Sequence, residues 1–298
     1  MGSLVVKQSI LAFLLLLNMA VASAEAGMST QKLQDVYASL RDELRNNHYN
    51  RPLYMESVEQ EETLKGDIYA VVDHDFATFS RVLDDPDNWC DVLLLHLNIK
   101  YCQAASGKSG TLLSVNLGKK TEQPLSKTYR LDFVFRSDKT APDHFNIQLT
   151  ADSGPVGTHD YRILLEAIPV NGKQTFMHLT YSYGFGLSSR LATKTYLSTM
   201  ARDKVGFTIT GKHADGTPQY VDGVRGVIER NTMRYYLAID AYLGGLSAPP
   251  GQQFEKRLKL VIDATEKYPL QLHEIDRNTY LEMKRHEHKR QQQSQASL

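Results

Sequence analysis

The side chains best suited to acid–base chemistry are two histidines and a glutamate. His178 lies on a predicted strand near Tyr181, with Glu166 on the strand before it, and His74 lies between two aspartates. A histidine beside a carboxylate can act as a general acid or base, although such a histidine more often has its hydrogen bonds satisfied within the fold. The chain contains no nucleophile elbow, phosphate-binding loop, zinc-protease motif or dinucleotide fingerprint. We therefore assign no catalytic residue and favour a non-enzymatic role.

The two cysteines, Cys90 and Cys102, lie in one short region of the chain. A bridge between them would close a loop of about 13 residues, which in the chain-entropy model stabilises the fold by about 3 kcal/mol. The alternative is a pair of buried free thiols, because the spacing alone does not fix the distance between them. No zinc-type spacing of Cys and His accompanies them, so we predict no metal site.

The first 26 residues have the pattern of a cleavable secretory signal peptide. Lys7 precedes an apolar run from Ile10 to Ala22, which is shorter than the roughly 20 apolar residues that span a bilayer. Small residues follow and offer two A-x-A sites, with cleavage after Ala24 or after Ala26. We expect secretion across the inner membrane, into the periplasm of a bacterial cell. The alternative is an uncleaved membrane anchor.

The charges of the chain are balanced, with 34 Lys and Arg residues against 34 Asp and Glu residues. This balance provides no global positive field, so nucleic-acid binding is not expected. Removing residues 1–26 from the 298 leaves 272, enough for one large domain with appendages. We expect no cofactor, and an exported protein of this kind could make transient membrane or envelope-protein contacts. Its oligomeric state is not determined by the sequence.

The periodicity of the apolar residues predicts a mixed α+β chain. A leading amphipathic helix runs from Thr30 to Leu44, and residues 54–72 read as strand. Successive strands then follow up to Tyr183, and Asn171-Gly172 between two of them is a strong hairpin signal. Hairpin after hairpin produces an antiparallel sheet, whose apolar face the helices must cover.

Several helices are expected after the sheet. Their predicted ranges are 189–204, 223–244 and 254–268, with a proline-rich linker at 247–251 and a charged, Gln-rich segment at 274–295. That last segment has no sustained apolar stripe, so we expect a solvated helix that frays into a disordered tail. We divide the chain into a signal peptide at 1–26, the leading helix at 27–52, a main domain at 53–246, and a linker with C-terminal helices and tail at 247–298.

The most distinctive local pattern is a helix, a kink and a second helix directly after a strand. Asp75 can cap the first helix, and Asp84-Asp85-Pro86 ends it and begins a second that carries Trp89. This acidic-Pro-x-x-Trp element, with the hairpins and the long late helix, resembles the START-like, or SRPBCC, helix-grip superfamily over about residues 53–244. The resemblance implies a curved antiparallel sheet gripping a long C-terminal helix around an apolar cavity, with extra N- and C-terminal helices here.

A cavity between a curved sheet and a helix stays open to an apolar guest if apolar side chains line it. Asn231 is a polar member of the long helix's apolar stripe, so it needs a hydrogen-bond partner there, either a ligand or the protein itself. The nearby Arg225, Arg230 and Arg234 read most simply as a solvated helix face, and the alternative is contact with an anionic head group at the cavity mouth. The candidate ligand-binding residues, which could equally fill a core, are Phe133, Leu165, Met177, Leu179, Tyr181, Val227, Ile228, Asn231 and Tyr235.

These patterns predict an exported, soluble protein that binds or carries a hydrophobic small molecule or lipid. One alternative is an enzyme of the same fold, such as a cyclase, dehydratase or hydrolase, using His178 or Glu166 as base. The other is a non-catalytic envelope interaction protein, which would leave an apolar stripe from Phe254 to Ile262 exposed on the isolated chain.

Overall fold

The computed structural model describes residues 27–107, 110–186 and 204–295. The predicted signal peptide and nearly all of the predicted helix at 189–204 lie outside these ranges. In the described part, eight strands form one antiparallel sheet in the order β1-β2-β8-β7-β6-β5-β4-β3. The strands are β1 (Leu53–Gln60), β2 (Thr63–Val72), β3 (Ile99–Gly107), β4 (Gly110–Leu117), β5 (Tyr129–Ala141), β6 (His144–Ser153), β7 (Thr158–Asn171) and β8 (Gln174–Phe185).

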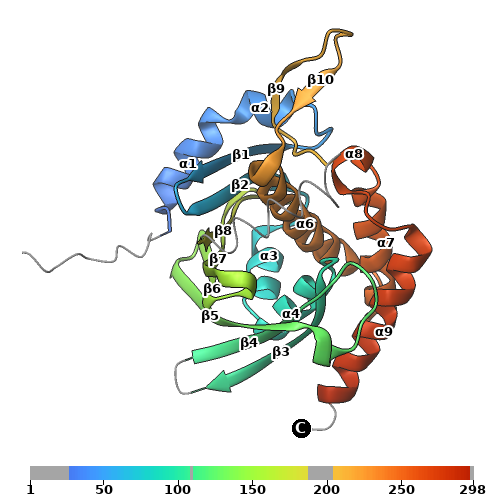
Figure 1. Cartoon of the computed structure of the whole chain (residues 1–298). Coiled ribbons are helices and arrows are strands. Elements are labelled where there is room, and N and C mark those ends of the chain that lie inside the picture. The colour runs from blue at the N-terminus through green and yellow to red at the C-terminus, as the bar shows by residue number, and fades with distance from the viewer. Residues whose placement is uncertain (1–26, 108–109, 187–203, 296–298) are drawn as a thin grey trace, which may run out of the picture.

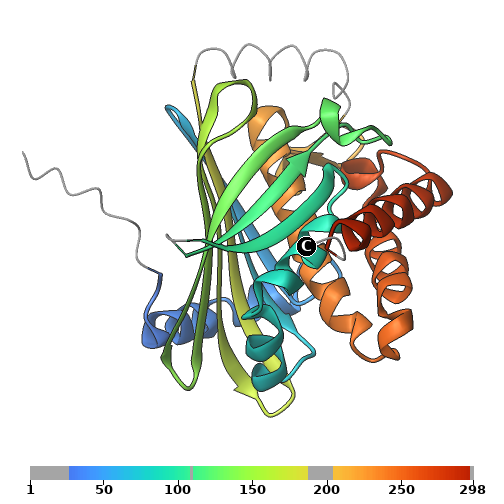
Figure 2. The same cartoon turned by 90° about the horizontal axis from the view of Figure 1, so that it is seen from below.

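Helices cover both faces of this sheet. Figure 2 shows the sheet nearly edge-on, with α6 and the C-terminal helices on one side and α1 on the other. The helices are α1 (Thr30–Ser39), α2 (Arg41–Arg45), α3 (Phe76–Leu83), α4 (Pro86–Leu94), α6 (Gly223–Gly245), α7 (Gln253–Thr265), α8 (Pro269–Leu272) and α9 (Arg277–Gln295). A small hairpin of β9 (Ile209–Lys212) and β10 (Pro218–Tyr220) projects from the body (Figure 1).

The order of the elements is that of the helix-grip fold. The strand β2 leads into the helix pair α3 and α4, which is followed by the antiparallel strands β3 to β8. The long helix α6 then crosses the concave face of this sheet (Figure 1). This topology confirms the predicted START-like, α+β architecture. β1 extends it, because residues 54–72 form a hairpin in which β1 adds an edge strand to β2.

The helix-kink-helix forms as its residues predict. The Asp75 carboxylate accepts a hydrogen bond from Thr78 N–H at 2.8 Å, and the Asp85 carboxylate accepts one from Asp87 N–H beside Pro86. Buried Trp89 then donates its indole N–H to the Leu83 carbonyl at 2.7 Å, which ties the second helix to the end of the first. α4 continues to Leu94, and β3 begins at Ile99.

Strand alternation divides the sheet into two different surfaces. On β8, Met177, Leu179 and Tyr181 belong to the main core beneath α6, whereas Phe176 belongs to a second, smaller core on the outer face. The leading helix α1 covers that outer face with Leu33, and Ser29 caps its first turn by accepting a hydrogen bond from Lys32 N–H. One sheet therefore serves two separate apolar layers.

The segment predicted to be a solvated, fraying tail is instead docked against the domain. α9 buries Lys284 and Glu287 completely, because Lys284 Nζ donates to the carbonyls of His96 and Ile99 and to Glu287 Oε2 at 2.7–2.8 Å. Lys100 adds a second ion pair to Glu287 at 3.0 Å. Burial lowers the pKa of Lys284 to about 8. The pattern was misread because polar side chains, rather than an apolar stripe, make this helix's buried face.

α7 is likewise covered. Leu258, Val261 and Ile262 are buried between α7, α6 and α9, so the exposed apolar stripe that a partner-docking tail would present is absent from these residues. No described helix is both long and apolar enough to cross a bilayer.

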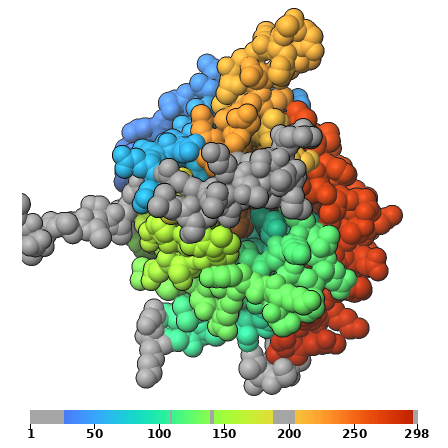
Figure 3. All heavy atoms as spheres, viewed as in Figure 1, coloured from blue at the N-terminus to red at the C-terminus, as the bar shows by residue number. Residues whose placement is uncertain are grey.

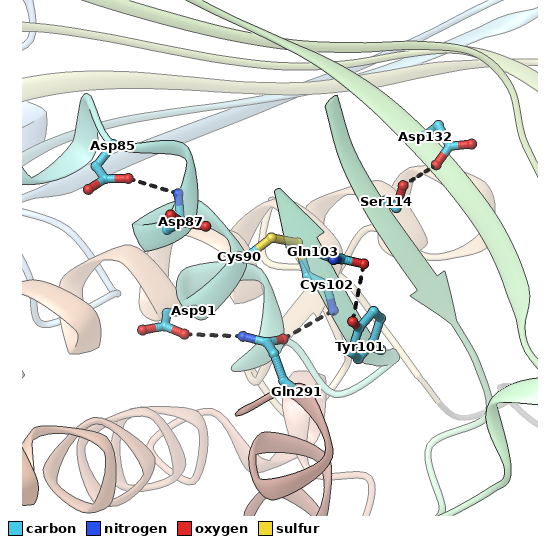
Figure 4. The surroundings of a disulfide bond; sticks show 10 residues. All are labelled: Asp85, Asp87, Cys90, Asp91, Tyr101, Cys102, Gln103, Ser114, Asp132 and Gln291. Carbon is cyan, nitrogen blue, oxygen red and sulfur yellow. Dashed lines mark hydrogen bonds between the residues drawn. A yellow bond between two sulfur atoms is a disulfide. The ribbon is translucent and has the colours of Figure 1, made fainter. Parts of the chain in front are cut away.

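A disulfide joins Cys90 of α4 to Cys102 of β3, as predicted, with Cα atoms 5.0 Å apart. Gln291 of α9 lies beside it (Figure 4), where its side-chain oxygen accepts from Cys102 N–H at 3.1 Å and its amide donates to Asp91 at 3.2 Å. The bridge and the tail helix therefore hold the same corner of the domain.

Replacing both cysteines, as C90S/C102S, is expected to lower the free energy of unfolding by about 3 kcal/mol, because the unfolded chain regains the entropy of the loop that the bridge closes. Urea denaturation of the two proteins measures the difference. A reductant should destabilise the wild-type protein and leave the double variant unaffected. An unchanged urea midpoint would contradict the stabilising role of the bridge.

Candidate ligand-binding site

The nine residues predicted to line a cavity divide into two groups. Seven are less than a tenth exposed and pack in the main core between the sheet and α6: Phe133, Leu165, Met177, Leu179, Tyr181, Ile228 and Tyr235. The other two, Val227 and Asn231, lie one helical turn apart on α6 and line a pocket beside the helix. Contact of any of these residues with a ligand remains a prediction.

This pocket has a volume of about 220 Å³ and lies where α6 meets three connecting segments. Val227, Arg230, Asn231 and Arg234 of α6 form its floor, since residues three and four apart share one face of a helix. The remaining lining residues come from elsewhere in the chain: Asn98 before β3, Lys120 after β4, and Glu274 between α8 and α9.

Positive charge dominates the pocket, with three cationic side chains around one carboxylate. Glu274 pairs with Lys120 at 2.7 Å and with Arg234 at 3.0 Å. Burial alone would raise the pKa of Glu274, but the two cations outweigh it and lower that pKa, so the carboxylate stays ionised. The Arg234 guanidinium also donates to Asn231 Oδ1 over a long 3.4 Å.

The arginines of α6 are not the solvated face that their spacing predicted. Arg230 is 2 % exposed and Arg234 is 8 % exposed, and Arg230 donates to the Val205 carbonyl at 3.2 Å. A buried guanidinium requires hydrogen-bond partners or a counter-charge. The C-terminal segment supplies Glu274 to Arg234, and the segment before β9 supplies the Val205 carbonyl to Arg230.

A second, smaller hollow of about 30 Å³ adjoins the pocket and shares Arg234 and Glu274 with it. Its walls are largely apolar, from Leu95 and Leu97 on one side and α7 and α9 residues on the other. This volume is enough for about one water molecule. The Arg234–Glu274 ion pair therefore separates a polar outer pocket from a small apolar inner one.

His96 borders the inner hollow with a polar atom that has no partner. Its Nδ1 accepts from Asn98 N–H at 3.2 Å and its ring stacks on Tyr235 at 4.7 Å, whereas its buried Nε2 makes no hydrogen bond. Burial, followed by the charges of Arg234 and Lys284, lowers the pKa of His96 well below its ordinary value. The ring is therefore neutral, and its Nε2–H is a donor without an acceptor.

Tyrosines concentrate at one end of the main core. Tyr161 and Tyr183 stack at 5.3 Å, and Tyr181 meets Tyr235 of α6 edge-on at 5.0 Å. Figure 3 shows the molecule hollowed at the centre of this face, between the yellow-green end of β6 and β7 and the green segment after β4. Burial raises the pKa of all four tyrosines, so each keeps its phenolic proton.

Two of the acid–base candidates, His178 and Glu166, lie on the opposite face of the sheet. His178 is buried with Nε2 at 2.8 Å from Asp67 Oδ1 and Nδ1 at 3.2 Å from Glu166 Oε2, and Tyr69 stacks on its ring at 4.3 Å. Tyr181, three residues along the strand, points into the main core instead, because side chains alternate. His178 and Glu166 therefore cannot serve a substrate held under α6. In the described ranges, no group of three or more His, Cys, Asp or Glu side chains is placed to hold a metal ion.

A wider depression of about 440 Å³ also lies over the strands, bordered by Lys65, Asp160 and Arg162. It is made of the mostly exposed ends of β1, β2, β7 and β8 and contains none of the predicted ligand-binding residues. We therefore base the candidate site on the pocket at Asn231.

Asn98, Lys120 and Glu274 are the site residues that sequence reasoning missed. They come from three connecting segments whose meeting point depends on how α9 docks. Arg234 carried a visible signal, because it falls three residues after Asn231, but charge alone suggested solvent exposure.

No family model and no curated protein sequence matches this chain. Solved structures that are similar to it include a conserved protein from Geobacillus kaustophilus (13% identity, TM-score 0.35), which covers 61% of this chain and 95% of its own. The ZhuI aromatase/cyclase from Streptomyces sp. R1128 (11%, TM-score 0.37) covers 66% and 99%. A START superfamily protein from Mycobacterium smegmatis (13%, TM-score 0.30) covers 48% and 93%. Similarities this low support no argument about activity, and the fold assignment rests on the strand order.

The buried His178 network generates a pH dependence of stability. Burial lowers the pKa of His178, but its bonds to Asp67 and Glu166 outweigh burial and raise that pKa above 6.5. For Asp67, burial is outweighed mainly by the bond to His178, and its pKa falls below 3.8. The imidazolium's contribution is complete below pH 6.5 and is lost as pH rises through the folded pKa. The Asp67 contribution is complete above pH 3.8 and is lost as pH falls through its folded pKa.

His178→Gln is therefore expected to cost most between pH 3.8 and 6.5, on the order of 3 kcal/mol at about pH 5, because it leaves two buried carboxylates without their cation. Urea unfolding of both proteins across a pH series measures this difference. His286→Gln, at an exposed histidine, is the control. A cost that stays constant from about pH 5 to 9 would show that His178 acts only through packing.

Proposed function

We propose that this chain is an exported, non-enzymatic binding protein for a small hydrophobic molecule that carries an acidic group. The pocket on α6 is the observation that carries the proposal. Three cationic side chains converge there on one carboxylate, beside Asn231, on a helix gripped by a curved sheet. Cationic donors in a partly buried site favour a carboxylate or a phosphate over a neutral group.

The size of the pocket limits what it can hold. Its 220 Å³ is smaller than the roughly 300–1,000 Å³ of sites that enclose a whole drug-sized ligand. The pocket therefore suits the head group of a longer molecule. In this proposal the acidic head contacts Arg234 and Asn231, and the apolar remainder packs among the apolar side chains between α6 and the sheet, where Ile228 and Tyr235 lie. Burial at about 25 cal/mol per Å² then provides most of the affinity.

The positions of His178, Glu166 and His96 support binding over catalysis. His178 and Glu166 lie on the outer face of the sheet, and the neutral His96 is a hydrogen-bond donor behind the Arg234–Glu274 pair. A protein of this kind, released outside the inner membrane, would carry a lipid or similar ligand between envelope membranes.

Native mass spectrometry of the mature protein from its own cell tests the proposal directly. A discrete additional mass that disappears on denaturation is expected and identifies the ligand. Dodecanoate is then the defined probe, with dodecanol as its neutral counterpart. We expect dodecanoate to bind at least about tenfold more tightly, which corresponds to about 1.4 kcal/mol for the head-group contact. Equal binding of the two, or no binding of either and no co-purified mass, would overturn it.

Two substitutions in the pocket should act in opposite directions. Arg234→Gln is expected to weaken dodecanoate binding about tenfold, because it removes a cation that contacts the head group. Glu274→Gln should strengthen binding, since it removes the carboxylate that competes for the same cations. Isothermal titration calorimetry measures both affinities. Arg81→Gln, at an exposed arginine on α3, is the matched control. Parallel effects from both pocket variants would indicate general loosening of the fold.

A further inference from the structure

Gly27, the first residue that the structure describes, lies against a buried carboxylate on the outer face of the sheet. A Cβ atom built on Gly27 would lie 2.5 Å from Glu166 Oε1 and closer still to the Asn146 amide nitrogen. Real Cβ atoms do not approach so closely, so a larger residue at this position would displace the Glu166 or Asn146 side chain. The backbone nitrogen of Gly27 is one bond of about 1.5 Å from this Cα, which places it within reach of Glu166.

Glu166 has one carboxylate oxygen without a hydrogen-bond donor. It is completely buried on β7, and its Oε2 is bonded to His178, but its Oε1 has no hydrogen-bond partner. His144 Nε2 lies 4.0 Å from Oε1 and is itself without a partner. A buried carboxylate oxygen without a donor costs several kcal/mol unless a charge or hydrogen bond compensates it.

The cations of this network contact Asp67 and the other oxygen of Glu166. His178 lies between the two buried carboxylates and reaches Glu166 through Oε2. Lys65, whose side chain is 38 % exposed, pairs with Asp67 Oδ2 at 3.3 Å. Glu166 Oε1, beside Gly27, is therefore the carboxylate oxygen at which a further donor fits.

We propose that the precursor is cleaved between Ala26 and Gly27, and that the new α-ammonium of Gly27 forms an ion pair with Glu166. A signal peptidase hydrolyses the Ala26–Gly27 peptide bond with one water molecule. This leaves a carboxylate on Ala26 and an amine on Gly27, which takes up a proton at neutral pH. The ammonium supplies three donors to a site that holds an unpartnered Glu166 Oε1 and His144 Nε2.

This geometry selects one of the two cleavage sites that the sequence allows. Cleavage after Ala24 would place the charged amine on Glu25, two residues before Gly27 in the sequence. Before cleavage, Gly27 has a neutral amide nitrogen with a single donor. The complete ion pair therefore forms only in the processed chain.

Docking of the amine would fix the start of α1. Ser29, which caps α1, follows Gly27 by two residues, and Met28 packs with the small outer core. Anchoring Gly27 therefore holds α1 on the outer face of the sheet. The proposal requires export but is independent of the ligand, so failure of ligand binding would leave it unaffected.

The N-terminus of the exported protein is the first test. Intact-mass analysis and N-terminal sequencing are expected to give a chain that starts at Gly27. A chain that starts at Glu25 would overturn the proposal but leave export in place, and an unprocessed chain would overturn both.

The reactivity of the Gly27 amine is the second test. Its acylation by a succinimidyl acetate reagent at neutral pH, followed by peptide mass spectrometry, should be at least about tenfold faster in Glu166→Gln than in wild type, because the ion pair that holds the proton is lost. Asp152→Asn, an exposed carboxylate on β6, should leave the rate unchanged. Equal rates in wild type and Glu166→Gln would overturn the proposal.

If Glu166→Gln does not fold, a chain that retains Ala26 before Gly27 provides the same test with Glu166 intact. It moves the ammonium away from Glu166 by one residue, so its urea midpoint should fall below that of the chain starting at Gly27. Identical midpoints would overturn the proposal.

Discussion

The burial of most of α6 is the constraint on which the rest of this structure depends. A helix that lies between a sheet and a second layer of helices has little solvent-facing surface on which to place its polar residues. Glu229 shows how the chain meets this demand, because its carboxylate accepts from the Ser57 and Thr208 hydroxyls and from the Phe207 and Thr208 amides at 2.6–2.9 Å. Close approach also matters, since a Cβ at Gly66 would overlap Thr232 on α6.

The candidate pocket is a consequence of that burial. Arg230 and Arg234 need acceptors or counter-charges, which come from the Val205 carbonyl before β9 and from Glu274 of the C-terminal layer. Because α9 is tied to the β3 corner by Lys284, Glu287 and Gln291, the loop carrying Glu274 is held at α6. The same contacts that stabilise the buried helix therefore assemble a polar site with excess positive charge, next to an apolar core.

The two faces of the sheet carry different kinds of side chains. The concave face supports the apolar core and the pocket, whereas the outer face holds the Asp67–His178–Glu166 network beneath α1. His178 and Glu166, the acid–base candidates in the sequence, therefore lie on the face that the N-terminal segment covers. Alternation along β8, where neighbouring side chains point to opposite faces, is the physical reason for this separation.

Local patterns by themselves determined the helix-kink-helix at Pro86, the hairpin at Asn171-Gly172 and the extent of α6, because caps, turns and periodicity act between residues close in sequence. Cys90 and Cys102 lie close enough in the sequence for a bridge to be predicted, and the structure contains it. Only the tertiary structure decided that Arg234 is buried, that α9 is docked through Lys284, and that Lys120 and Glu274 meet at Asn231. A charged side chain is buried or solvated according to whether a distant segment supplies its partner, and that choice is made by packing between segments remote in the chain.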